Sequence, residues 1–332
     1  MDKLFHTHSR TRTAAGSPSV GALVRQGARR LQRAGLHYGH GTDNPWDEAA
    51  ALTLHALGLP PAGGAPLWRR RVGSAARARV RALLTRRIRE RIPAAYLTGI
   101  TWFAGLPFQV DSRVLIPRSP IAELIERGYA PWIDPRRVRR ALDIGTGSGC
   151  IAIATARALP RARIDAVDVS DAALAVAAIN VRRHRLGRRV RLVKSDYFAA
   201  LGRATYDIIV SNPPYVGSRE LRTLPPEYRH EPRGALAAGA SGLDAVRVIL
   251  ARARSHLRPG GVLIVEVGNT EAAVRRAFPR LPFVWLQFAR GGGGVFLLRR
   301  EELPGAVPPA RRAPRTRRAR QARRRAPALR RN

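Results

Sequence analysis

The feature that most constrains the fold is a regular alternation of strand and helix patterns from about residue 139 onward. Short apolar runs alternate with amphipathic stretches of helical periodicity. The expected strands are Ala141–Ile144, Arg163–Asp168, Val190–Lys194, Asp207–Val210, Val262–Val267, Phe283–Phe288 and Val295–Leu298, and the expected helices are Cys150–Leu159, Ala172–His184, Leu243–Leu257 and Thr270–Phe278. This alternation predicts an α/β fold with a doubly wound, mostly parallel sheet. The last two strands follow each other closely, so we expect them to form an antiparallel hairpin at one edge.

A separate helical region precedes the sheet region. Its apolar spacing predicts helices over residues 17–36, over Pro45–Gly58 with Asn44 as the cap, and over residues 74–91. Together they predict an N-terminal helical domain over residues 1–93. Residues 94–118 are expected to form a strand-rich linker with a hairpin at Trp102–Val110, and residues 119–302 the sheet domain.

The net charge of +37 comes almost entirely from arginine. Residues 303–332 contain no Asp or Glu and are dominated by Arg, Pro and Ala, so this tail is expected to be disordered. An arginine-rich tail can contact RNA or another polyanion through phosphate groups. It can equally be a solvated extension without a specific role.

The composition excludes several kinds of protein and site. No apolar run is long enough to span a bilayer, and the N-terminus lacks the apolar segment of a secretory signal, so no membrane contact is expected. Cys150 is the only cysteine, which excludes an intrachain disulfide and a multi-cysteine zinc site and is consistent with a reducing cytoplasm. The histidines lack ligand spacing, so no metal is expected.

A glycine-rich loop follows the first strand of the sheet domain and opens a helix. Its residues are Gly145, Thr146, Gly147, Ser148 and Gly149. The loop lacks the spacing of a pyrophosphate-binding fingerprint, and Asp143 before it would repel phosphate but would suit the cationic methionine end of S-adenosyl-L-methionine. Asp168, at the end of the second strand, is placed to accept hydrogen bonds from ribose hydroxyls. Asp196 and Tyr197 can contact the adenine. Without a ligand, the same residues would be an ordinary strand-to-helix turn and a surface turn.

The tetrad Asn212-Pro213-Pro214-Tyr215 follows the fourth strand, at the edge where open α/β sheets bind ligands. An amide or arylamine nitrogen is a poor nucleophile because its lone pair is delocalised. The Asn212 side-chain carbonyl and the Pro213 backbone carbonyl can accept its two N–H groups and aim the nitrogen at a methyl donor. The prolines, Pro214 included, stiffen the loop, and Tyr215 can stack on a planar acceptor. The two loops together predict methyl transfer to a planar nitrogen.

Two further features have simpler interpretations. Glu266, on a buried strand, can line the site or be a hydrogen-bonded core carboxylate, and we favour the core carboxylate. Gly291–Gly294 is expected to be a flexible turn between the last two strands.

With these motifs, the chain resembles the protein-(glutamine-N(5)) methyltransferase family, in the branch that acts on large-subunit ribosomal protein L three. The shared core is Asp143–Gly149 with Asn212–Tyr215. The branch-specific likeness lies in five strings: Tyr38–Ala49, Arg91–Thr98, Val114–Ile121, Glu227–Pro232 and Glu266–Asn269. The resemblance covers about Leu23 to Arg300. It implies a seven-stranded class I methyltransferase (Rossmann-like) sheet, a helical substrate-recognition domain and a β-hairpin linker. It also implies S-adenosyl-L-methionine at the glycine loop, Asp168, Asp196 and Tyr197, and the substrate glutamine at the tetrad.

Two departures and three alternatives accompany this resemblance. Relatives usually carry an acidic residue among the glycines of the last hairpin and end near residue 300, whereas this chain has Arg290–Gly294 and a tail.

One alternative function is that of the sister branch, which modifies the Gly-Gly-Gln glutamine of release factors. That branch typically has Thr-Glu where Pro120-Ile121 stands here. Adenine N(6)-methylation of nucleic acid would use the same tetrad chemistry but calls for a larger base-flipping domain. A non-catalytic ribosome- or RNA-binding factor is the third alternative, and the presence of both loops argues against it.

Overall fold

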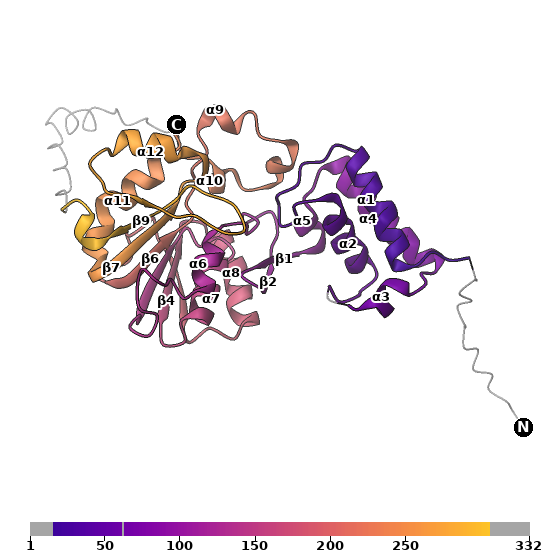
Figure 1. The fold of residues 1–332 in the computed structure, drawn as a ribbon, viewed down its shortest axis with the longest axis horizontal. Helices are drawn as coiled ribbons and strands as arrows, with labels where there is room; N and C mark the ends of the chain where they lie inside the picture. Colours follow the sequence, from indigo (N-terminus) through magenta and orange to yellow (C-terminus); the bar gives the residue numbers. More distant parts are fainter. Residues whose placement is uncertain (1–15, 62, 306–332) are drawn as a thin grey trace, which may run out of the picture.

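The computed structural model describes residues 16–61 and 63–305 and shows a small helical domain joined by a hairpin to a larger sheet domain (Figure 1). The expectations of disorder and RNA contact for the tail concern residues that, from 306 onward, lie outside the described part of the chain.

The helical domain is built on four helices: α1 (Val20–Arg33), α2 (Pro45–Ala56), α3 (Ala65–Arg69) and α4 (Ser74–Glu90). Helix α2 begins as expected, because the Asn44 side chain accepts a hydrogen bond from the Asp47 amide at 2.9 Å. Apolar side chains of α1, α2 and α4, among them Leu31, Leu52 and Leu84, are fully or almost fully buried in one common core.

The linker, expected to be strand-rich, begins with a short helix that the sequence analysis did not predict. Helix α5 (Ala94–Thr98) starts directly after Pro93 and stops at Gly99, whose φ of +71° suits a left-handed cap. The expected hairpin then follows as the antiparallel strands β1 (Ile100–Phe103) and β2 (Leu106–Gln109). The backbone of Gln109 exchanges two hydrogen bonds with the Asn180 side chain, at 2.8 and 2.9 Å, which fixes the hairpin to the sheet domain.

The sheet has seven strands in the order β5-β4-β3-β6-β7-β9-β8, which confirms the predicted fold class. Its strands are β3 (Arg140–Ile144), β4 (Arg163–Asp168), β5 (Val190–Lys194), β6 (Tyr206–Ser211), β7 (Leu257–Glu266), β8 (Val284–Trp285) and β9 (Val295–Arg299). Strands β3 to β7 are mutually parallel, whereas β9 runs antiparallel to both β7 and β8. The expected antiparallel pair therefore lies at the edge that β8 forms.

Helices cover both faces of the sheet (Figure 1). The covering helices are α6 (Ile121–Glu126), α7 (Cys150–Ala158), α8 (Asp171–Arg183), α11 (Asp244–His256) and α12 (Glu271–Ala277). The sheet domain also contains the short helices α9 (Ser218–Leu221) and α10 (Arg233–Leu236) and the 3-10 turns η1 (Pro226–His230), η2 (Gly268–Thr270) and η3 (Arg300–Glu302). Side chains of β6 alternate between two cores, since Ile208 packs with α6 and α7 whereas Ile209 packs with α11 and α12. Leu303, expected in the tail, is buried in the second core.

Strand β8 is shorter than the expected Phe283–Phe288. The chain leaves the sheet because the Ala289 and Arg290 amides donate hydrogen bonds to the Glu123 carboxylate of α6, at 3.0 and 2.7 Å. The glycines that follow permit close packing: a Cβ on Gly294 would lie 2.0 Å from the Gly268 carbonyl oxygen. Along the described part of the chain, no helix is both long and apolar enough to cross a membrane.

Candidate functional site

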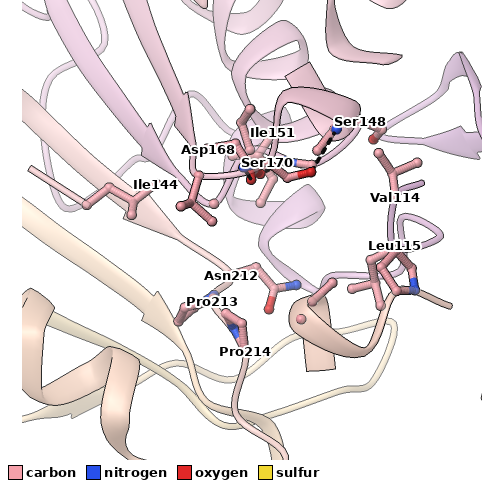
Figure 2. Close-up of a pocket in the computed structure, with 18 of the residues that line it drawn as sticks. Val114, Leu115, Ile144, Ser148, Ile151, Asp168, Ser170, Asn212, Pro213 and Pro214 are labelled. Atoms are coloured by element: carbon pink, nitrogen blue, oxygen red, sulfur yellow. Dashed lines mark hydrogen bonds between the residues drawn. The ribbon is translucent and has the colours of Figure 1, made fainter. Parts of the chain in front are cut away.

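The two predicted loops lie side by side at the carboxyl edge of the sheet. Strands β3 and β6 are neighbours, and their register pairs Ile144 with Ser211, the last residues before the two loops. The Ser211 hydroxyl also donates to the Ile144 carbonyl at 2.7 Å. Both loops line one cavity of about 500 Å³. Figure 2 shows Asn212 and Pro214 across this cavity from Asp168.

The glycine loop is shaped by backbone hydrogen bonds and held by Asp168. The Gly145 and Thr146 amides both donate to the Val167 carbonyl at 2.9 Å, and Gly145 and Gly147 have φ values of +72° and +53°. Such angles favour glycine. The Asp168 carboxylate accepts hydrogen bonds from the Gly147 and Ser170 amides, each at 2.9 Å. Asp168 thus fixes the loop and also lines the cavity, together with Gly145, Thr146, Gly147 and Ser148.

Asp143 and Gly149 lie behind the cavity wall. Asp143 is fully buried and accepts hydrogen bonds from the Thr146 hydroxyl at 2.6 Å and the Ala152 amide at 3.1 Å. Its other oxygen, Oδ1, has no hydrogen-bond partner among the described residues. Burial raises the pKa of Asp143 to about 7, although these hydrogen bonds lower it. Gly149, with a φ of +80°, caps α7. Contact between Asp143 and a methionine end stays a prediction, because its observed contacts are with the loop itself.

Asp196 and Tyr197 line the cavity where β5 ends, as expected. Tyr197 has a φ of +49°, which is uncommon outside glycine. The Ser195 hydroxyl supports this turn by donating to the Tyr197 carbonyl at 2.9 Å and accepting from the Ala200 amide at 3.0 Å. The turn is therefore built to hold both side chains at the cavity edge.

Three residues of the tetrad line the cavity, and the fourth supports the loop from outside the cavity. Asn212, Pro213 and Pro214 line the cavity, whereas Tyr215 does not. The Tyr215 ring packs over Gly268, where a Cβ would lie 2.5 Å from a ring carbon, and its hydroxyl donates to Glu266 at 3.3 Å. Stacking of Tyr215 on an acceptor stays a prediction, since the ring contributes here to holding the loop.

Glu266 is a hydrogen-bonded core carboxylate that also contacts the site. Its side chain accepts hydrogen bonds from Tyr215 and from the Ser119 hydroxyl, the latter at 2.5 Å. Burial raises the pKa of Glu266 to about 7, against the lowering effect of these hydrogen bonds and of Arg118. Glu266 thereby joins the tetrad to Ser119, the first residue after the linker.

The sequence did not predict two of the cavity walls. One is the linker, which contributes Arg113, Val114, Leu115, Pro117, Arg118 and Ser119, and the other follows η1 and contributes Pro232, Gly234, Ala235 and Ala237. Figure 2 shows Val114 and Leu115 on the side of the cavity opposite Ile144. Neither segment has a local pattern that marks a site. The only signal was that Val114–Ile121 and Glu227–Pro232 belong to the strings that carry the resemblance.

The histidines near the linker, His37 and His40, pack against the ring of Tyr228. The His37 and His40 rings lie 5.5 and 4.5 Å from the Tyr228 ring, measured between centroids. Within residues 16–61 and 63–305, no three His, Cys, Asp or Glu side chains are grouped so that they could hold a metal ion.

Comparisons with known proteins agree with this architecture. Residues 22–99 match the family described as PrmC N-terminal domain, and residues 130–224 match the Methyltransferase small domain. The ribosomal protein uL3 glutamine methyltransferase of Bordetella pertussis is 51% identical over 282 residues, which cover 85% of this chain and 95% of that protein. Proteins of the same name from Neisseria meningitidis serogroup B and Xanthomonas campestris pv. campestris are each 50% identical, again over 85% of this chain, and cover 93% and 91% of their own lengths. Because about half of the aligned residues are identical over nearly the full length of these relatives, the chain belongs to the ribosomal protein uL3 glutamine methyltransferase family.

Proposed function

We propose that this protein transfers a methyl group from S-adenosyl-L-methionine to the side-chain amide nitrogen, N(5), of a glutamine in large-subunit ribosomal protein L three (uL3). The observation that carries the proposal is that the glycine loop and residues Asn212, Pro213 and Pro214 line one cavity. The name shared by relatives about half identical to this chain supports the same substrate.

The residues present suit S-adenosyl-L-methionine. When bound, this donor supplies a methyl group attached to a sulfonium. Asp168 and Asp196 offer carboxylate acceptors on the cavity wall, and the unpartnered Oδ1 of Asp143 places a further acceptor beneath the loop. Carboxylate acceptors on the cavity wall favour a cationic ligand that carries hydroxyl and amino donors. No metal is part of the proposal.

The tetrad would orient the acceptor amide. The Asn212 side-chain carbonyl and the Pro213 backbone carbonyl accept the two N–H groups, which directs the nitrogen lone pair at the methyl carbon. The N–C bond forms as the C–S bond breaks, and the nitrogen then loses one proton to water, so no strong general base is required. Tyr215 and Glu266 hold the loop from behind.

The parts of the chain would divide this work. Residues 1–93 recognise the protein substrate, residues 94–118 form the linker that also lines the cavity, and residues 119–302 carry the transfer. The reaction would take place in the cytoplasm, where ribosomal proteins are made. RNA contact by residues 303–332 stays a prediction that no described residue tests.

The test is a transfer assay with three acceptors side by side: purified uL3, release factor and adenine-containing DNA, each with methyl-labelled S-adenosyl-L-methionine. Label on uL3, located at a glutamine by mass spectrometry, is the expected result. Label only on release factor would assign the enzyme to the sister branch, and label only on DNA would keep the tetrad chemistry but change the substrate. No transfer to any acceptor would favour the binding-factor alternative.

A further inference from the structure

The segment that follows the tetrad carries two buried carboxylates with different partners. Glu227 lies within η1 and contacts the helical domain, whereas Glu231, directly after η1, contacts the linker. We call the segment Glu227–Glu231 the clip. Both carboxylates are buried, with exposed fractions of 0% for Glu227 and 5% for Glu231.

The Glu227 end of the clip binds the helical domain at three points. Its Oε1 atom accepts hydrogen bonds from Arg87 Nη1 at 3.2 Å, from the His37 amide at 3.1 Å and from Arg91 Nη1 at 3.4 Å. Arg87 is itself 1% exposed and also donates to Glu48 Oε1 within the helical domain, at 2.6 Å. One buried arginine therefore joins a carboxylate of its own domain to a carboxylate of the sheet domain.

The Glu231 end binds the linker. Arg118 donates to both Glu231 oxygens, at 2.5 and 2.7 Å, and the Ile116 amide donates to Oε1 at 3.1 Å. Burial would raise the pKa of Glu231, but the Arg118 and His40 interactions outweigh burial and lower it to about 2. Glu231 is therefore ionised at neutral pH, and the pair with Arg118 is bidentate.

The clip leads directly into a wall of the cavity. Pro232, Ala235 and Ala237, which follow it, line the cavity. This wall is also tied to the tetrad, because Val216, next to Tyr215, donates from its amide to the Leu236 carbonyl at 2.8 Å and accepts from the Ala238 amide at 3.0 Å. A displacement of the clip would therefore move the wall opposite the glycine loop and strain the tetrad.

Stability alone does not account for this arrangement. Buried ion pairs lose much of their Coulombic gain to desolvation, and well-packed apolar residues often stabilise a fold as well or better. Buried ionic contacts do fix geometry, because each charge requires its partner at hydrogen-bond distance. The clip joins three parts of the molecule: the helical domain, the linker and the Pro232–Ala237 wall of the cavity.

We propose that Glu227 is a positioning residue, which holds the Pro232–Ala237 wall in place from the helical domain so that the acceptor glutamine is bound correctly. This inference deepens the proposed function and rests on it. Glu227 touches no reacting atom and acts through the wall. Its loss should weaken acceptor binding and leave the donor loop, which lies across the cavity, unaffected.

Arg87 offers a matched pair of variants, because it binds one carboxylate in each domain. Glu227→Gln removes the charge between the domains, and Glu48→Gln removes the equally buried charge within the helical domain. We expect Glu227→Gln to raise KM for uL3 about tenfold, the effect of one lost charge-assisted hydrogen bond. The dissociation constant for S-adenosyl-L-methionine should change less than about twofold in both variants. Glu48→Gln keeps the Arg87–Glu227 pair and should therefore raise KM for uL3 less than Glu227→Gln does.

Hydrogen exchange tests the clip without any transfer reaction. The Ala238 amide, bonded to Val216, should exchange faster in Glu227→Gln than in the parent and in Glu48→Gln, because the wall opens more often. If uL3 is not a substrate, the transfer assay fails for the parent as well, and the exchange measurement still tests the clip. If Glu227→Gln does not fold, Arg91→Ala, whose side chain is 33% exposed, provides the same test with a smaller expected effect in the same direction.

Two results would overturn the proposal. One is an equal rise in KM for uL3 in both variants, which would assign the effect to the helical domain as a whole. The other is parent-like kinetics and parent-like exchange of the Ala238 amide in a folded Glu227→Gln protein.

Discussion

Asn212 is the one tetrad side chain whose polar group faces the cavity. Replacing it with Ala removes an acceptor that orients the substrate amide but leaves the donor loop unchanged, so we expect kcat to fall by about 10²-fold or more with little change in donor affinity. Single-turnover transfer and equilibrium binding of S-adenosyl-L-methionine measure the two effects separately. Asn269→Ala is the control, since Asn269 is exposed, lies outside the cavity and bonds to Glu220. Equal losses of affinity and turnover in Asn212→Ala would contradict the orienting role.

Glu266 makes stability depend on pH in a defined direction. Burial raises its pKa from the ordinary 4.5 to about 7. A carboxyl with a higher pKa in the folded state stabilises the fold below its unfolded pKa, and this contribution is lost as the pH rises through its folded pKa. The free energy of unfolding of Glu266→Gln, measured relative to the parent, should therefore increase between about pH 4.5 and about pH 7 and then level off. Urea denaturation across this range measures the difference, and a difference that does not vary with pH would rule out the raised pKa.

At the residue scale, local sequence predicted the side chains at the ends of the strands, but neither the linker wall nor the Pro232–Ala237 wall of the cavity. Asp168, Asp196 and Asn212 line the cavity because each lies at or within two residues of the end of a parallel strand, which is a local property. Tyr215 faces Glu266 because Gly268 leaves room for its ring, and Gly268 is 53 residues further along the chain. The local sequence around Tyr215 contains no signal for a contact with a residue so far along the chain.

At the scale of elements, periodicity predicted the long helices and the buried strands. The helices it missed have four to six residues, such as α5 and α6, which is too short for a periodic signal. The predicted length of strand β8 was too long. Its end is set by hydrogen bonds from the amides of residues 289 and 290 to Glu123, which is far away in sequence.

The residue directly after η3, Leu303, is part of the core of the sheet domain. Leu303 is 1% exposed in the core that α11 and α12 cover, and its carbonyl accepts a hydrogen bond from Arg254 at 2.6 Å. Leu303→Ala should lower the free energy of unfolding by about 2 to 4 kcal/mol, because the truncation leaves a cavity in a packed core. Denaturant unfolding measures this loss, and Leu115→Ala, on the open cavity wall, provides the comparison. A loss below about 0.5 kcal/mol would mean that the domain ends before Leu303.

At the scale of the whole molecule, the five strings that carry the family resemblance converge in space. Glu48, Arg91, Arg118, Glu231 and Glu266 come from different strings, and all take part in the contacts around the clip or the Tyr215 support. The sequence identified these strings without assigning them a role, because their contacts span 39 to 147 residues along the chain. Only the folded chain shows that these strings contact one another and that two of them, Val114–Ile121 and Glu227–Pro232, line the cavity.

The net charge of +37 predicts an unusual response to salt. Like charges repel more strongly in the compact state. Salt at 0.1 M largely screens interactions between exposed charges more than about 10 Å apart, whereas buried pairs such as Arg87–Glu227 are screened much less. The melting temperature should therefore rise between about 0.05 M and about 0.5 M NaCl. Thermal unfolding measured in NaCl and in KCl checks this, since screening predicts the same rise in both. A falling melting temperature would mean that exposed ion pairs outweigh the repulsion.

The distance of Glu227 from Arg87, 140 residues along the chain, determines when the enzyme becomes complete. During synthesis the helical domain emerges with Arg87 paired to Glu48 alone, long before Glu227 has been translated. The sheet strands that end at both loops are also made before Glu227, so a nascent chain can possess the donor loop and the tetrad without a fixed acceptor wall. Docking of the two domains and closure of the cavity then occur together, as one late event. A chain that ends before Glu227 would lack strands β7 and β9 as well as the acceptor wall, so the sheet and the acceptor site are both completed only by residues made after Glu227.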